Sequence, residues 1–283
     1  MRPAHYITLA IAIALIAFLY WGGNTIPPSK PVLSERPTGM PPGSNPMKTA
    51  SFDSVLAASK AALPKEASDE LNNIEKELAA THDSSRMAAV FLKLAHLWDV
   101  NKFQPVAAYY GAKAAKLENS EKKLNFAGQF FLDLMRRDDV SPSMQLWEAN
   151  EAIECFKRSL EINPDNDTTK LLLASTYIDG TGETMQGVQM LLVLTREKPD
   201  YLPANLLLGR LAVKSGQFDK AITRLEGILK KYPDNSEALY FLAEAYKGKG
   251  DKQKAIELFE KCKKIVNKPE FTKEVDQYIN SFK

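Results

Sequence analysis

Apolar residues recur at helical spacing along most of this chain after residue 50, and no segment there shows the strict alternation of a half-buried strand. The last residues illustrate the pattern, with apolar side chains at i, i+4, i+7, i+8 and i+11: Phe271, Val275, Tyr278, Ile279 and Phe282. Such spacing makes one face of a helix apolar. The pattern predicts an all-α protein that ends in an amphipathic capping helix over residues 270–283.

The amino terminus has a different pattern, because no formal charge interrupts the run from Ala4 to Gly23. About 20 apolar residues are enough to cross a bilayer as a helix, so residues 1–23 are predicted to be a single transmembrane anchor. A cleaved signal peptide is the alternative, but it needs small residues in an A-x-A-like pattern after its apolar core, and the sequence there is FLYWGG. Arg2 and the terminal amine favour a cytoplasmic amino terminus and an exported remainder, although two positive charges also follow the span.

Residues 24–50 connect this segment to the helical part and hold seven of the sixteen prolines: Pro27, Pro28, Pro31, Pro37, Pro41, Pro42 and Pro46. Proline removes a backbone donor and disfavours helix in the preceding residue, so we predict a proline-rich linker. A docking motif for a groove-type domain is the alternative use of this composition. Residues 51–87 are predicted to form amino-terminal capping helices, with pairing between two copies through residues 51–80 as the alternative.

A repeat of 34 residues runs through the carboxyl-terminal half, which divides into the units 168–201, 202–235 and 236–269. The step separates residues of the same type: Pro199 and Pro233; Gly182, Gly216 and Gly250; Ala221 and Ala255. Gly209 is expected to let the two helices of its unit approach closely, and Gly216 to permit the turn between them, because glycine tolerates positive φ. With two helices per unit, this period resembles the tetratricopeptide repeat family, over residues 88–269.

Two earlier units, 88–120 and 121–167, fit the repeat less well. Gly128 and Ala152 are 24 residues apart, whereas Gly209 and Ala221 are 12 apart, so twelve residues are inserted. The pair Ser141-Pro142 is typical of an N-cap followed by proline in the first turn, which predicts a lengthened second helix. Trp147 would then either cover the neighbouring repeat or contact a partner.

The resemblance implies a right-handed superhelical solenoid of about five helix-turn-helix repeats over 88–269. In this family the first helix of each unit lines a concave groove that binds other proteins or extended peptides. Carried over by position, the groove would present Leu92, His96, Asn125, Gln129, Leu172, Thr176, Leu206, Arg210, Tyr240 and Glu244. This mixture of apolar and charged residues suits an extended peptide or a partner helix. The family's clamps for chaperone tails use several cationic and amide positions, of which Arg210 alone has a counterpart here.

The composition argues against several classes of function. Lys and Arg number 37 and Asp and Glu 35, which argues against a surface that binds nucleic acid. Two cysteines and three histidines leave little material for a metal site or a catalytic centre, and no catalytic, cofactor-binding or metal-binding residue is predicted. Cys155 and Cys262 are expected to be buried as small hydrophobes. His96 is expected at the surface or in the groove, and the glycine-rich segment 179–184 as a turn rather than a phosphate loop.

Anchor, linker and solenoid together predict a non-enzymatic membrane-anchored scaffold. The expected location is the bacterial inner membrane with the carboxyl-terminal domain in the periplasm, where the solenoid would hold other envelope proteins during assembly, secretion or chaperoning. One alternative is an organellar import receptor with a cytosolic solenoid. Another is an enzyme subunit whose activity lies in the groove, which the scarcity of histidine disfavours.

Overall fold

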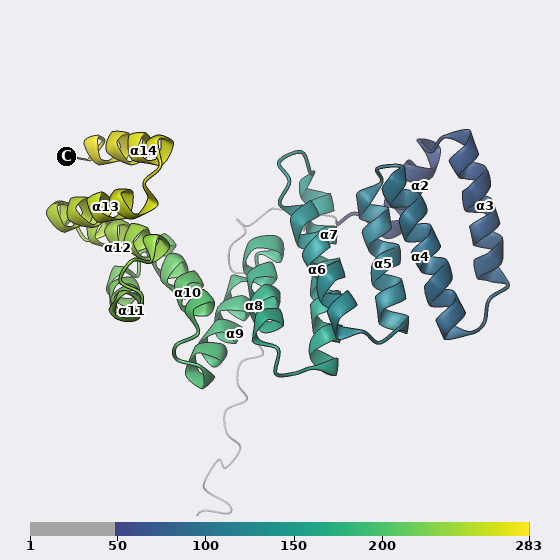
Figure 1. The fold of residues 1–283 in the computed structure, drawn as a ribbon, viewed down its shortest axis with the longest axis horizontal. Coiled ribbons are helices and arrows are strands. Elements are labelled where there is room, and N and C mark those ends of the chain that lie inside the picture. The colour runs from purple at the N-terminus through teal and green to yellow at the C-terminus, as the bar shows by residue number, and fades with distance from the viewer. Residues whose placement is uncertain (1–48, 283) are drawn as a thin grey trace, which may run out of the picture. The chain divides into compact units, whose positions relative to one another are not determined.

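The structure, a computed structural model, describes residues 49–282. Within these residues the chain forms helices joined by short turns and contains no strand, as the sequence pattern predicts (Figure 1). The predicted anchor, residues 1–23, lies outside the described residues, and so does the linker up to residue 48. Among the helices of the described part, none combines the length and apolarity that a membrane crossing requires.

Consecutive helices pack beside one another along a row (Figure 1). In chain order they are α2 (Phe52–Ala61), α3 (Lys65–Ala79), α4 (Ser84–Val100), α5 (Gln104–Leu117), α6 (Glu121–Met135), α7 (Pro142–Ile162), α8 (Asp167–Thr176), α9 (Thr184–Glu197), α10 (Leu202–Lys214), α11 (Phe218–Lys231), α12 (Ser236–Gly248), α13 (Lys252–Val266) and α14 (Pro269–Asn280). The pairs α4/α5, α6/α7, α8/α9, α10/α11 and α12/α13 correspond to the five predicted units. Buried apolar residues form successive clusters along this row, as expected for stacked repeats.

Small residues set how closely the two helices of a unit approach. A Cβ on Gly209 would lie 2.8 Å from Cδ2 of Leu225, and one on Gly128 would lie 2.6 Å from the Phe156 ring. Both distances are too short for a carbon contact, so glycine is required unless a neighbour moves. Gly216 has φ +72°, in the region that glycine tolerates best. The roles predicted for Gly209 and Gly216 are confirmed.

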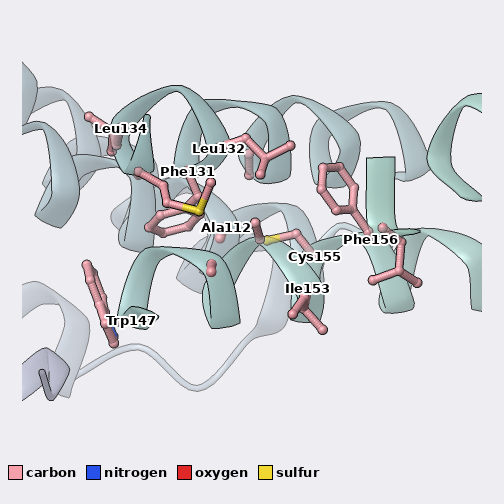
Figure 2. Packing of buried hydrophobic residues seen from close by; sticks show 14 of the residues in the cluster. Ala112, Phe131, Leu132, Leu134, Trp147, Ile153, Cys155 and Phe156 are labelled. Atoms are coloured by element: carbon pink, nitrogen blue, oxygen red, sulfur yellow. The ribbon is translucent and has the colours of Figure 1, made fainter. Parts of the chain in front are cut away.

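The inserted residues lengthen α7 to 21 residues, with Ser141 at its N-cap and Pro142 in its first turn. Trp147 lies in the added turns and is buried, with its ring at 5.8 Å from that of Phe131 between centroids (Figure 2). Phe52 of α2 covers it from another side at 6.5 Å. Trp147 is therefore covered by its own chain, in part by an element that the sequence did not place there.

The two helices expected to cap the amino-terminal end have different positions. α3 packs along α4, and its apolar side chains Leu71 and Ile74 are buried. α2 instead packs against α5, and the backbone N–H of Ala50 donates to the carbonyl of Ser143 at 3.1 Å, at the start of α7. The large apolar residues of both helices thus pack within the chain, while Ala57, Ala58 and Ala61 of α2 are exposed.

Two further predictions concern turns and the carboxyl-terminal end. Residues Tyr177–Thr181 continue α8 as one π-helical turn, and Gly182 follows with φ +74°. This segment joins two helices and is the expected turn. α14 covers the last pair through Val275 and Ile279, both buried, as the predicted capping helix should.

Candidate functional site

The exposed side chains of α4, α6, α8, α10 and α12 form what we call the first-helix face. Polar N-caps fix where four of these helices begin, and two of them flank α5: Asp83 accepts from the N–H of Arg86 before α4, and Ser120 accepts from that of Lys123 before α6. These caps set the register in which α4 and α6 present their side chains on either side of α5. The face has two apolar pockets.

The larger one, the Phe126 pocket, has a volume of about 380 Å³. Leu92, His96 and Asp99 of α4 form one wall, and Lys123, Phe126 and Phe130 of α6 form the other. The floor is the surface of α5, where a Cβ on Gly111 would meet no atom within 4 Å. The pocket is therefore open down to the helix backbone.

The side chains around this pocket are unusually exposed for their type. Phe126 is 72% exposed and Leu92 43%. The Phe126 ring stacks on that of Phe130, with centroids 6.5 Å apart, which holds the aromatic wall in place. Asp99 and Lys123 add one charge of each sign. Such an arrangement can hold a large apolar side chain while polar groups at the edge meet the backbone of the same ligand.

The second, the Tyr240 pocket, has a volume of about 260 Å³ and lies where α12, α13 and α14 meet. Tyr240 and Phe241 come from α12, Cys262 and Val266 from α13, and Phe271 from α14. Tyr240 meets Phe241 edge-on at 5.6 Å between ring centroids. Like the Phe126 pocket, it lies between a first helix and the helix two places further along the chain.

The structure brings some of the predicted groove residues together and removes others. Leu92 and His96 share the Phe126 pocket, Tyr240 lies in its own pocket, and Gln129 and Arg210 are exposed on the same face. His96 is thus a surface residue of the groove, as expected.

Thr176 and Leu206 are corrections to the predicted groove. Thr176 is fully buried, and its hydroxyl donates to the carbonyl of Leu172 at 2.7 Å. Leu206 is buried in the cluster that contains Leu225. Both side chains lie inside the fold, and a ligand on the face would not reach them.

The remaining three predicted residues are partly used inside the fold. The side-chain oxygen of Asn125 accepts from the hydroxyl of Thr169 at 2.9 Å, which ties α6 to α8. Leu172 is half-buried against the cluster around Trp147. Glu244 is half-buried as well. These side chains have less freedom to meet a ligand than the exposed ones.

Sequence reasoning missed the aromatic residues of the Phe126 pocket. Phe126 and Phe130 were not among the predicted set, which followed fixed repeat positions. A usable signal exists at Phe126, which lies next to the apolar stripe of its helix rather than within it. An aromatic residue outside the buried stripe points to solvent, and an exposed phenylalanine on a repeat helix is a candidate contact.

The ionisable groups near the Tyr240 pocket have raised pKa values, which favour their neutral forms. Burial raises the pKa of the Cys262 thiol. Burial, and after it the charge of Glu244, raises the pKa of Tyr240. Burial and then a hydrogen bond with Glu244 raise the pKa of Tyr278 to about 12. A thiol with a raised pKa is a poor nucleophile at neutral pH. Over residues 49–282 no cluster of His, Cys, Asp and Glu is arranged to hold a metal ion.

Cys155 is buried like Cys262, and both are free thiols, as expected for small hydrophobic residues. Burial raises the pKa of the Cys155 thiol to about 12. Neither cysteine therefore contributes a reactive group to the first-helix face.

Comparisons with known proteins are consistent with this architecture. Residues 206–266 and 144–166 each match a family model described as "Tetratricopeptide repeat". The chain is 26% identical over 180 residues to the mouse protein "Interferon-induced protein with tetratricopeptide repeats 2", a match that covers 59% of the chain and 37% of that relative. The chain thus spans less than half the length of this curated relative.

Two solved structures are similar at low identity. The structure titled "Crystal structure of YrrB: a TPR protein with an unusual peptide-binding site" is 17% identical, with a TM-score of 0.46, covering 67% of this chain and 92% of that one. PilW, a "widely conserved type IV pilus biogenesis factor", is 19% identical, with a TM-score of 0.47, covering 64% of this chain and 78% of that one.

Proposed function

We propose that this chain, which contains tetratricopeptide repeats, is a scaffold that binds segments of other polypeptides on its first-helix face. The Phe126 pocket carries the proposal, because it combines an open apolar cavity with a phenylalanine that is 72% exposed. Covering one phenylalanine removes on the order of 100 Å² of apolar surface from water, which is worth roughly 2 kcal/mol to binding.

The ligand that suits both pockets is an extended segment with large apolar side chains. Each pocket takes one apolar side chain, and the exposed Gln129 and Arg210 provide polar groups on the same face. Hydrogen bonds from such groups would meet the ligand's backbone between anchors. A catalytic role has less support, because burial raises the pKa of the Cys262 thiol in the Tyr240 pocket, which makes it a poor nucleophile at neutral pH.

We further propose that residues 1–23 anchor the scaffold in a bacterial inner membrane and that the repeats work in the periplasm on envelope proteins. The uncharged run from Ala4 to Gly23 supports the anchor, and the charge of Arg2 supports the orientation. An organellar receptor with the repeats in the cytosol is the alternative. A protease added outside intact cells or organelles separates the two, because it would digest the repeats in the organellar case.

Site-specific photo-crosslinking in intact cells tests the binding face. A photoreactive residue at Phe126 in the full-length protein should yield adducts with other polypeptides. The matched control is the same residue at Glu154, which is exposed on α7, a second helix. Equal adduct yields at both positions would contradict the proposed face. Adducts confined to cytosolic proteins would contradict the periplasmic location and leave the face intact.

A further inference from the structure

A third pocket lies outside the first-helix face, in the unit 202–235. Its volume is about 590 Å³, the largest of the described pockets. Pro199, Leu202 and Asn205 line it at the start of α10, and Arg224, Gly227 and Lys231 line it from α11. This pocket, which we call the Arg224 pocket, runs along α11 from Asp219 and Lys220 in its first turn to Lys231 at its end.

Arg224 is the central polar group of this pocket. Its side chain is half-buried, and Nη1 donates to the side-chain oxygen of Asn205 at 2.5 Å. The amide of Asn205 in turn donates to the carbonyls of Pro199 at 2.8 Å and Tyr201 at 3.1 Å, which fixes its orientation. Burial lowers the pKa of Arg224. Among the ion pairs of residues 49–282, none includes this guanidinium.

The neighbouring repeats show that this polar pair is not required by the fold. Thirty-four residues earlier the same two positions hold Leu171 and Met190, and thirty-four later they hold Leu239 and Leu258. Leu171, Met190 and Leu258 pack against hydrophobic clusters, and Leu239 is buried. A half-buried arginine and asparagine at this place forgo that packing, and their polar atoms are instead held by hydrogen bonds to each other and to the backbone.

Gly227 is a second departure at the same pocket. It lies within α11, where glycine weakens a helix relative to alanine. A Cβ at this position would meet no atom within 4 Å, so packing does not demand a glycine. The equivalent residues of the neighbouring repeats are Val193 and Lys261. The missing side chain keeps the pocket open beside Arg224, one turn away.

Arg224 and Lys220 are the two cations of the pocket that make no ion pair among the residues described, and Lys220 donates instead to the side-chain oxygen of Gln217 at 2.8 Å. Lys231 pairs with Asp200 at 2.5 Å, and the carboxylate of Asp219 pairs with Lys249 at 2.5 Å. Leu202 and Ile228 supply apolar walls. A guanidinium presents a planar fork of donors that matches a carboxylate, and a partly desolvated one binds it more strongly than in water.

We propose that the Arg224 pocket is a second ligand site, which binds the carboxylate of an acidic peptide with an apolar residue beside it. Asn205 positions the guanidinium, Arg224 pairs with the carboxylate, and the apolar walls hold the neighbouring side chain. The site does not depend on binding at the first-helix face, since the two share no lining residue.

The test follows the Arg224 Nε–H signal by NMR in full-length protein with ¹⁵N-arginine, in an uncharged detergent. Three probes are titrated: acetyl-Leu-Glu-Leu-amide, its Gln counterpart acetyl-Leu-Gln-Leu-amide, and acetyl-Leu-Gln-Leu with a free carboxyl terminus. We expect saturable shifts of this signal with the two carboxylate peptides and no shift with the neutral one. The peptide that binds more tightly shows whether the site prefers a glutamate side chain or a carboxyl terminus. Inorganic phosphate is a fourth arm. Shifts with phosphate alone, equal shifts with the neutral peptide, or no shift at all would overturn the proposal.

Variants make the test specific to this residue. Arg224→Gln should weaken binding about tenfold or more, the loss expected for a charge-assisted hydrogen bond, whereas Lys230→Gln on the same helix should not change it. A double variant, Asn205→Leu with Arg224→Leu, restores the apolar pair of the neighbouring repeats. It should fold with a higher Tm and show no binding, read from the peptide signals. Binding at wild-type strength in the double variant would refute the site.

Discussion

The units 121–167 and 202–235 each consist of two packed helices, but the side chains between these helices differ. In the first, large aromatic side chains fill the space between α6 and α7, and Trp147 on the added turns extends the core to α2. In the second, the contact is made by Gly209 and Leu225, and the end of the unit holds a polar pocket. The repeat therefore determines the backbone arrangement. The side chains determine whether a unit has a large aromatic core or a small core beside a surface pocket.

The largest effect is expected from the aromatic core of the first unit. Phe156 is fully buried and lies against Gly128, so Phe156→Ala would leave a cavity that α6 is poorly placed to fill. We expect the free energy of unfolding to fall by about 3–5 kcal/mol. Urea unfolding followed by circular dichroism measures it. Leu225→Ala is the matched change in the second unit, and a larger loss there would reverse the contrast between the units.

A buried carboxyl in the first unit should make its stability depend on pH. Glu148 is 1% exposed, and burial raises its pKa to about 7, with Arg137 opposing and Asp139 adding to the shift. The unfolded chain, with a pKa near 4.5, releases this proton more readily than the folded one. Stability that is present below pH 4.5 is therefore lost as the pH rises to about 7.

Replacing the Glu148 carboxyl by an uncharged amide tests this pH dependence. Glu148→Gln should raise the free energy of unfolding by about 2 kcal/mol at pH 8 and change it little at pH 4. Urea unfolding at both pH values measures the difference. Glu154→Gln, an exposed change on the same helix, is the control. A gain for Glu148→Gln that is equal at both pH values would contradict a raised pKa.

A smaller effect is expected where α2 joins the first unit. Phe52 stacks on Tyr109 at 3.5 Å between centroids and covers Trp147. Because Phe52 is half-buried, Phe52→Ala should cost about 1–2 kcal/mol locally. Hydrogen exchange should show faster exchange in residues 52–61, with α10–α13 unchanged. Protection of α2 at the wild-type level would mean that other contacts hold it.

The sequence predicted the regular part of this molecule well because its signals are local. Glycine at 182, 216 and 250 and alanine at 221 and 255 recur at a fixed step, and the three glycines all have positive φ. The twelve-residue insertion could be placed for the same reason, since Ser141-Pro142 marks a helix start. These features need no knowledge of distant parts of the chain.

The parts that sequence reasoning missed depend on contacts between separate elements. The cover of Trp147 by Phe52 joins residues about a hundred positions apart, and nothing near either one signals it. Thr176 was assigned to the groove from its repeat position, but its side chain is buried and its hydroxyl donates to the carbonyl of Leu172. Repeat position predicts which helix a residue belongs to, while exposure depends on how that helix packs.

The smallest effect is expected from replacing glycines in the middle of helices. Such a glycine can merely weaken its helix, or it can also keep a binding pocket open. Gly227→Ala should raise the free energy of unfolding by about 0.5–1 kcal/mol, because alanine favours helix and the added Cβ meets no atom within 4 Å. Gly111→Ala in α5 is the matched control, since its Cβ is equally free and it lies in the Phe126 pocket. Both changes should stabilise the protein by similar amounts in urea unfolding. Gly227→Ala should in addition weaken binding of the acidic peptide, which Gly111→Ala should leave unchanged. If both variants gain stability and both bind as before, the open side of the Arg224 pocket has no part in recognition, and the glycine there needs another explanation.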